Sequence, residues 1–160
     1  MKKPNLTRLA AQESLLPHRT VPTTLAQNRG MQARALGYIA EDHALAYLEK
    51  QGLQLIARNV KFKLGELDLI MWQENAENHA ETCLVFVEIK TRVSEVFGGA
   101  MASIDATKKR RMQAAAQLFL QQWQANTGAL PAARFDMVSV AQAGGGLYCC
   151  EWLKDVALAA

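Results

Sequence analysis

The sequence predicts a single α/β domain in which a mixed central sheet is flanked by helices. Two long stretches show the spacing of a buried helix face, and five shorter apolar stretches have the character of strands. They follow one another in the order helix, three strands, helix, two strands. The chain has 160 residues, 50% of them hydrophobic, which is enough for one core and too few for two ordinary domains.

The first helix is expected from about Met31 to about Gln51, where Gly52 is placed to end it. Its apolar stripe consists of Leu36, Ala40, Ala44, Tyr47 and Leu48. The second helix, which Ser103 or Asp105 can cap, is expected to run to about Ala125. Its apolar stripe consists of Met112, Ala116, Phe119, Leu120 and Trp123.

Three strands are expected between the helices, at residues 53–62, 65–72 and 83–92. A polar loop at residues 75–82 separates the second strand from the third. Two closing strands are expected at residues 134–140 and 147–153, joined by a glycine-rich turn.

Residues 1–30 are expected to form a flexible basic arm, and residues 31–160 the single domain. The arm is polar and contains Pro4, Pro17 and Pro22. A plain disordered extension and a tail that touches nucleic acid both remain open. The arm has no continuous apolar core of the kind a secretory signal needs, and no run of about 18 apolar residues occurs in the chain, so no membrane partner is expected.

The cysteines favour a reducing, cytoplasmic location. Cys149 and Cys150 are chain neighbours, which rarely bond to each other, and Cys83 completes no metal-binding spacing. The formal net charge of +3 is mild, so it serves a polyanionic partner only if the cations cluster.

Two neighbouring strands each have a face on which charged and apolar residues separate, because alternate residues of a strand share a face. These faces are Glu66, Asp68, Ile70 and Trp72 on one strand and Leu84, Phe86, Glu88 and Lys90 on the other. An antiparallel register that sets Trp72 beside Leu84 also sets Asp68 beside Glu88 and Glu66 beside Lys90. Three carboxylates and one lysine then gather at one end of the hairpin.

Facing carboxylates destabilise a sheet by up to about 1 kcal/mol, and by more when they are desolvated. Lys90 supplies one positive charge, whereas a divalent cation supplies two and is commonly held by a pair of carboxylates with waters and a substrate phosphate. The pattern therefore indicates a metal site. A solvated ladder of ion pairs is the alternative.

The first helix adds Glu41 to this picture. Gly37, Glu41, Ala44 and Leu48 fall on one stripe, so Glu41 is expected at or beside the packing face. Gly37 is expected to let the helix approach its neighbour closely and so bring Glu41 to the strand acids. In the alternative, Glu41 lies at the edge of the face and bends out to solvent.

The second helix begins with four cations, Lys108, Lys109, Arg110 and Arg111. They oppose the helix dipole at this end, which suggests contacts outside the helix, such as with the phosphates of nucleic acid. Lys108 lies on the row that leads to Met112 and is expected nearest the acidic cluster. A solvated charge run is the alternative.

Several segments, taken together and in order, resemble a known family. They are "GYIAEDHALAYLEKQGLQLIARN", "GELDLI", "FVEIKTR", "FGGA", the lysine at 108 and "RFDMV". The resemblance covers about residues 31 to 140 and is to the YraN family of uncharacterised bacterial proteins. That family is assigned to the restriction-endonuclease-like, or PD-(D/E)xK, superfamily and is similar to archaeal Holliday-junction resolvases. The chain departs from the usual "GE" pair of the helix, since it has "AE" at positions 40 and 41.

The resemblance implies a restriction-endonuclease-like three-layer core with Asp68 as the motif aspartate, Glu88 as the motif acid and Lys90 as the motif lysine. Mg²⁺ or Mn²⁺ would be held by Asp68, Glu88 and the carbonyl of Ile89. Glu41 is similar to the helix glutamate of the resolvase branch and would be a further ligand and catalytic residue. Glu66 and Lys108 also match the family pattern.

The implied function is metal-dependent endonuclease activity on structured or branched DNA, with Lys108, Lys109, Arg110, Arg111 and Arg92 in contact with nucleic acid. Resolvases act as two-fold dimers, so a homodimer is an open expectation. Two alternatives remain. The first is a non-catalytic nucleic-acid-binding or scaffold protein in DNA repair or processing, and the second is an ordinary protein-interaction domain.

Overall fold

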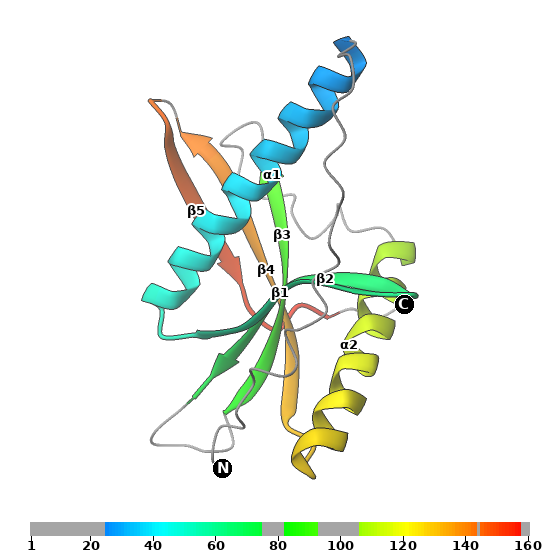
Figure 1. The fold of residues 1–160 in the computed structure, drawn as a ribbon. Helices are drawn as coiled ribbons and strands as arrows, with labels where there is room; N and C mark the ends of the chain where they lie inside the picture. Colours follow the sequence, from blue (N-terminus) through cyan, green and yellow to red (C-terminus); the bar gives the residue numbers. More distant parts are fainter. Residues whose placement is uncertain (1–24, 75–81, 93–105, 144, 158–160) are drawn as a thin grey trace.

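The structure of the protein is a computed structural model that describes residues 25–74, 82–92, 106–143 and 145–157, except for the side chains of residues 25–34 and 92. This part of the chain forms two helices and five strands, and Figure 1 shows how they are arranged. They are α1 (Leu25–Lys50), β1 (Gln54–Phe62), β2 (Gly65–Gln73), β3 (Cys83–Arg92), α2 (Ala106–Thr127), β4 (Ala132–Ala143) and β5 (Leu147–Leu153).

The strands form one mixed sheet in the order β1-β2-β3-β4-β5. Every neighbouring pair is antiparallel except β3 and β4, which are parallel and are connected through α2. A parallel pair needs such a crossover, because the chain must return to the same end of the sheet. The predicted α/β class with a mixed sheet is confirmed.

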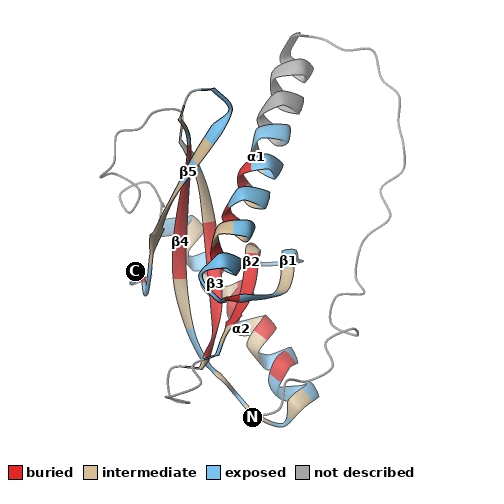
Figure 2. Cartoon of the chain, turned by 90° about the vertical axis from the view of Figure 1, so that its left-hand side faces the viewer, coloured by how far each residue is buried: buried red, intermediate tan, exposed pale blue. Residues whose placement is uncertain are grey.

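The two helices cover opposite faces of the sheet, which gives three layers. Alternate residues of β3 point to opposite faces. Val85 packs in the cluster that contains Ala44 of α1, whereas Phe86 packs in the cluster that contains Phe119 of α2. Figure 2 shows that the middle strands of the sheet are the most buried part of the described chain.

The predicted stripe of α2 is buried at Met112, Ala116, Phe119 and Trp123, and Leu120 is partly buried. The ring of Trp123 stacks on Trp72 of β2 at 5.8 Å between centroids. This contact ties α2 to the predicted apolar end of the β2–β3 hairpin.

The first helix differs from its prediction in three respects. It begins at Leu25 rather than at Met31. Leu36 is exposed, because α1 diverges from the sheet toward its N-terminal end (Figure 2) and only Ala40, Ala44 and Leu48 of the predicted stripe are fully buried. Gly37 makes no close approach, since a Cβ added there would meet no atom within 4 Å.

The strand predictions agree with the observed bounds to within a few residues, and those for β3 and β5 coincide with them. Predictions for residues 1–24, for most of the polar loop at 75–82 and for the caps Ser103 and Asp105 fall outside the described residues. Neither described helix is apolar enough over a sufficient length to cross a membrane.

Candidate active site

The candidate site lies where the pairing of β2 with β3 ends. The predicted register is confirmed for the apolar part of the hairpin, where Trp72 is opposite Leu84 and Ile70 is opposite Phe86. The last pair is Leu69 with Val87. The two strands separate beyond it, so the acids that follow are not held in the ladder.

Glu66 corrects the prediction. It was expected beside Lys90, but the β2–β3 ladder ends at Leu69 and Val87, so this pair does not form. On the other side of β2, Glu66 lies opposite Lys61 of β1. The pair with Lys90 is lost because the β1–β2 hairpin turns away from β3 and reaches the first turns of α2 (Figure 1). A Cβ at Gly65 would lie only 2.3 Å from the backbone oxygen of Arg111, so the start of β2 packs directly on the helix backbone.

Asp68 occupies the gap that opens between the strands. Its Oδ2 accepts a hydrogen bond of 2.9 Å from the backbone N–H of Ile89. If the register continued for two more residues, Leu67 would lie opposite Ile89. The carboxylate of Asp68 therefore accepts the hydrogen bond from the N–H of Ile89 that a carbonyl of β2 would otherwise accept. The N–H and C=O of one strand residue point to the same side, so the carbonyl of Ile89 faces the same gap.

Glu88 is a buried acid with two cations. Its side chain is 3% exposed, and its Oε1 lies 3.4 Å from Nζ of Lys90 on the same strand. The Nζ of Lys108, from α2, forms a second ion pair with the same oxygen. A carboxylate this deeply buried requires such partners, because an uncompensated charge is very costly away from water.

The surroundings of Asp68 shift its pKa. Burial raises the pKa of Asp68 to about 7, with the charge of Glu88 as the next cause. The N–H of Ile89 and the charge of Lys108 act in the opposite direction, and Glu41 adds a small further increase. Asp68 therefore exchanges its proton near neutral pH.

Lys108 lies within the field of three acids. Burial lowers its pKa, but the hydrogen bond and charge of Glu88, followed by Asp68 and Glu66, leave the pKa above its ordinary value. The prediction that Lys108 lies nearest the acidic cluster is confirmed. Lys108 therefore remains protonated beside the candidate metal ligands.

Glu41 turns toward β1. Its side chain is only 17% exposed, which corrects the alternative of an edge glutamate bent into solvent. Its Oε2 accepts a hydrogen bond of 2.9 Å from Nδ2 of Asn59 and lies 3.4 Å from Nη2 of Arg58. Asn59 has a positive φ of 54°, a conformation that asparagine tolerates better than most residues.

The remaining predicted cations differ in their surroundings. Lys109 is partly buried, and both Arg110 and Arg111 are exposed. The side chain of Arg92 lies outside the described residues. Their predicted contacts with nucleic acid stay predictions.

The fit of a metal ion can be judged from the donor groups. Across the described ranges, no three or more His, Cys, Asp or Glu side chains are grouped so as to hold a metal. What Asp68, Glu88 and the carbonyl of Ile89 offer is a small set of oxygen donors. Mg²⁺ is usually held by one or two carboxylates, with waters and substrate phosphates completing its shell, so this set suits a magnesium-like ion that binds together with substrate.

Asp136 is a second buried acid, which sequence reasoning did not single out. It is 0% exposed and lies on the sheet face that α1 covers. It accepts hydrogen bonds from Arg134 at 2.9 and 3.0 Å, from Nε1 of Trp152 at 3.0 Å and from the backbone N–H of Asp155 at 2.8 Å. With four donors its role is structural, and it fastens β5 and the following residues to β4. The signal in the sequence is an acid between the apolar residues of "RFDMV", with an arginine two positions before it.

Comparison with known proteins assigns the chain to a family. The profile of Uncharacterised protein family UPF0102 matches residues 40–140, a range that contains every acid and lysine of the candidate site. A UPF0102 protein of Pseudomonas entomophila is 44% identical over 74% of this chain and 89% of its own. Others are 41% identical in Ralstonia nicotianae, over 77% of this chain and 86% of the relative, and 40% identical in Herminiimonas arsenicoxydans, over 75% and 87%. The chain therefore belongs to the uncharacterised protein family UPF0102, the YraN family that its motifs predict.

Proposed function

We propose that the protein is a metal-dependent endonuclease that hydrolyses phosphodiester bonds, with structured or branched DNA as its substrate. One observation carries this proposal. Asp68 and Glu88 come together where the β2–β3 ladder ends, with lysines from two elements beside them. Acids and cations gathered at a break in a regular ladder are more typical of a functional site than of a sheet that is only structural.

In the proposed mechanism, Asp68, Glu88 and the carbonyl of Ile89 hold Mg²⁺ or Mn²⁺, and Glu41 and Glu66 contribute from the edge of the site. A bound divalent ion would polarise the phosphate and lower the pKa of an attacking water. Lys90 orients that water or stabilises negative charge on the phosphoryl oxygens. Lys108 neutralises Glu88 when no metal is bound.

The raised pKa of Asp68 gives this proposal a further consequence. With a pKa of about 7, Asp68 is only partly ionised at neutral pH. Since a carboxylate must be deprotonated to bind a metal, uptake of the ion would release a proton and would weaken below pH 7.

The alternative is a non-catalytic nucleic-acid-binding or scaffold protein of DNA repair or processing. One observation favours it, namely that Glu88 forms ion pairs with two lysines. In that case the basic residues at the start of α2 would bind phosphates, and the acids would serve only to fix Lys90 and Lys108.

A cleavage screen separates the two. Duplex, flap, four-way junction and single-stranded DNA and RNA are incubated with the protein and either Mg²⁺ or Mn²⁺. The proposal predicts cleavage of at least one substrate, lost in Asp68→Asn and Lys90→Ala and retained in Glu49→Gln, a change at an exposed residue of α1. Absence of cleavage together with tight binding would instead support the alternative.

A two-fold homodimer, nucleic acid as the partner and a cytoplasmic location complete the proposal. Sedimentation of the free protein and of its complex with a four-way DNA junction tests whether the protein is a dimer. A mass of one chain in both would reject the dimer without affecting the chemistry proposed at Asp68.

A further inference from the structure

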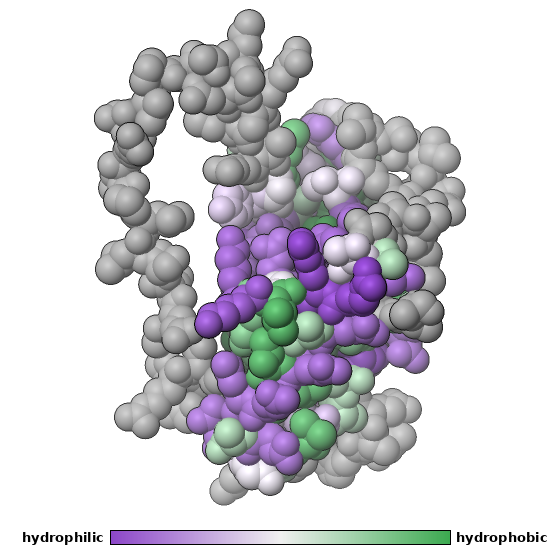
Figure 3. Space-filling view, turned by 90° about the vertical axis from the view of Figure 1, so that its right-hand side faces the viewer, coloured by the Kyte–Doolittle hydropathy of each residue, from purple (hydrophilic) through white to green (hydrophobic). Residues whose placement is uncertain are grey.

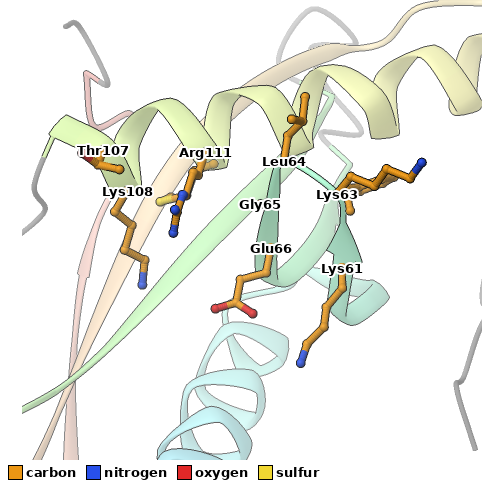
Figure 4. Close-up of a pocket in the computed structure, with 10 residues that line it drawn as sticks. Lys61, Lys63, Leu64, Gly65, Glu66, Thr107, Lys108 and Arg111 are labelled. Atoms are coloured by element: carbon orange, nitrogen blue, oxygen red, sulfur yellow. The ribbon is translucent and has the colours of Figure 1, made fainter.

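A basic pocket of about 600 Å³ lies between the β1–β2 turn and the first turns of α2. The turn contributes residues 61–66, and the helix contributes Thr107, Lys108, Arg111 and Met112. Figure 4 shows that Lys61, Glu66, Lys108 and Arg111 point to the same side, whereas Lys63 turns its ammonium group away from them. A volume of about 600 Å³ is within the size range of ligand sites.

The pocket favours an anion. Four cations line it, against Glu66 as its one carboxylate. Within the described part of the chain, neither Lys61 nor Arg111 takes part in an ion pair. Their charges are therefore available to a phosphate, which arginine and lysine both bind well.

The pocket also offers apolar surface. Phe62, Leu64 and Met112 belong to its lining, and Leu64 is 59% exposed. Figure 3 shows one face of the molecule, on which an apolar patch lies among mostly hydrophilic residues. Cations beside apolar surface suit a nucleotide, in which a charged phosphate is joined to a base with an apolar face.

The two walls of the pocket are held at a fixed separation. Gly65 lies against the backbone of Arg111 so closely that a single added carbon would clash. The backbones of the two walls are therefore in direct contact at this point.

The pocket adjoins the candidate active site. Lys108 lines the pocket and also pairs with Glu88, and Glu66 precedes Asp68 by two residues on the same strand. A strand whose nucleotide occupies the pocket would thus carry its next phosphodiester toward Asp68 and Glu88.

We propose that this pocket binds one unpaired nucleotide of a nucleic-acid strand, with its phosphate on Lys61 and Arg111 and its base against Leu64 and Phe62. The proposal rests on the proposed endonuclease function and narrows its substrate class to nucleic acid with an unpaired segment at the cleavage site.

The test measures binding in EDTA, so that cleavage plays no part. Fluorescence anisotropy is recorded with a labelled 12-nucleotide oligothymidine and with a 12-base-pair duplex. Lys61→Ala and Arg111→Ala are expected to weaken single-strand binding by about five-fold or more each, and duplex binding by about two-fold or less. Lys50→Ala is the control, since Lys50 is an exposed cation of α1 that does not line the pocket, and it should change both affinities by about two-fold or less.

Equal losses for Lys50→Ala and Arg111→Ala, equal losses on the duplex and the single strand, or no binding of the oligothymidine by the wild type would overturn the proposal. Circular dichroism of each variant verifies its fold. Asp68→Asn separates this test from that of the proposed function: it should bind the oligothymidine normally and fail to cleave. If it cleaves normally while the pocket variants lose single-strand affinity, the endonuclease site at Asp68 is wrong and the pocket stands.

Discussion

The carboxylate of Asp68 accepts a hydrogen bond of 2.9 Å from the backbone N–H of Ile89, across the gap where β2 and β3 stop pairing. This bond gives the buried N–H the partner that the ladder no longer provides. It also fixes the carboxylate of Asp68 beside Glu88. Burial and the charge of Glu88 both disfavour the ionised form of Asp68 at this position.

Asp68→Asn is predicted to stabilise the metal-free protein at high pH. The pKa of Asp68 is about 7 in the folded state against 3.8 as the ordinary value, so the folded state holds this proton more tightly. The contribution of Asp68 to the free energy of unfolding therefore falls as pH rises from about 4 to about 7. Asparagine keeps the acceptor for Ile89 and has no proton to lose, so the variant should gain up to about 4 kcal/mol at pH 8 and little at pH 4.

Urea unfolding in EDTA at pH 4 and pH 8 measures this difference. Glu49→Gln serves as the control, because Glu49 is exposed, and should change the free energy of unfolding by less than about 0.5 kcal/mol at either pH. A variant at position 68 that is less stable than the wild type at pH 8 would show that the ionised carboxylate is not under strain.

Lys108→Met is predicted to destabilise the metal-free protein, because it removes one of the two cations paired with the buried acid Glu88. Loss of one partner of a fully buried pair costs about 3–5 kcal/mol, but Lys108 is partly exposed, so about 1–2 kcal/mol is expected. Thermal unfolding of Lys108→Met and Lys109→Met gives the comparison. Equal stabilities of the two variants would mean that the ion pair with Glu88 contributes nothing.

Gly65→Ala and Gly37→Ala are predicted to have opposite effects. At Gly65 the new Cβ would lie 2.3 Å from the backbone oxygen of Arg111, so β2 and α2 must move apart at a cost of about 1–3 kcal/mol. At Gly37, inside α1, the Cβ meets nothing within 4 Å and alanine is the better helix former, so about 0.5–1 kcal/mol is gained. Chemical denaturation of the two variants measures both effects, and a stabilising Gly65→Ala would refute the close approach.

Asp136→Ala is predicted to lose more than about 3 kcal/mol of stability, because it leaves Arg134, the Trp152 indole and one backbone N–H without their acceptor. Trp152→Phe removes a single one of these bonds and keeps an aromatic ring, so about 1 kcal/mol is expected. Both changes lie on the sheet face away from Glu88. Altered metal affinity in a folded Trp152→Phe variant would contradict the purely structural role.

Much of the fold is contained in local patterns of the sequence. The charged and apolar ends of β2 and β3 were enough to predict their register at Trp72 and Leu84, because a shift by one residue would reverse both faces. Lys108 could be placed near the acids in the same way, since it shares a helix row with the buried Met112.

Other features depend on how the elements meet and have no local signal. The β2–β3 ladder ends at Leu69 because the β1–β2 hairpin turns toward α2, and Glu66 is therefore not paired with Lys90. Leu36 fits the apolar stripe of α1, but it is 49% exposed in the described part of the chain. The pocket at Lys61 and Arg111 is formed by segments about fifty residues apart, so neither segment indicates it alone.

The central claim is that Asp68 and Glu88 together hold a divalent cation, and titration of the wild-type protein with Mn²⁺ by calorimetry at pH 7.5 tests it most directly. The predicted result is saturable binding that is lost in Asp68→Asn and in Glu88→Gln and kept in Glu49→Gln. Binding that persists unchanged in the first two variants, or its absence from the wild type both alone and with a non-cleavable DNA present, would contradict the claim.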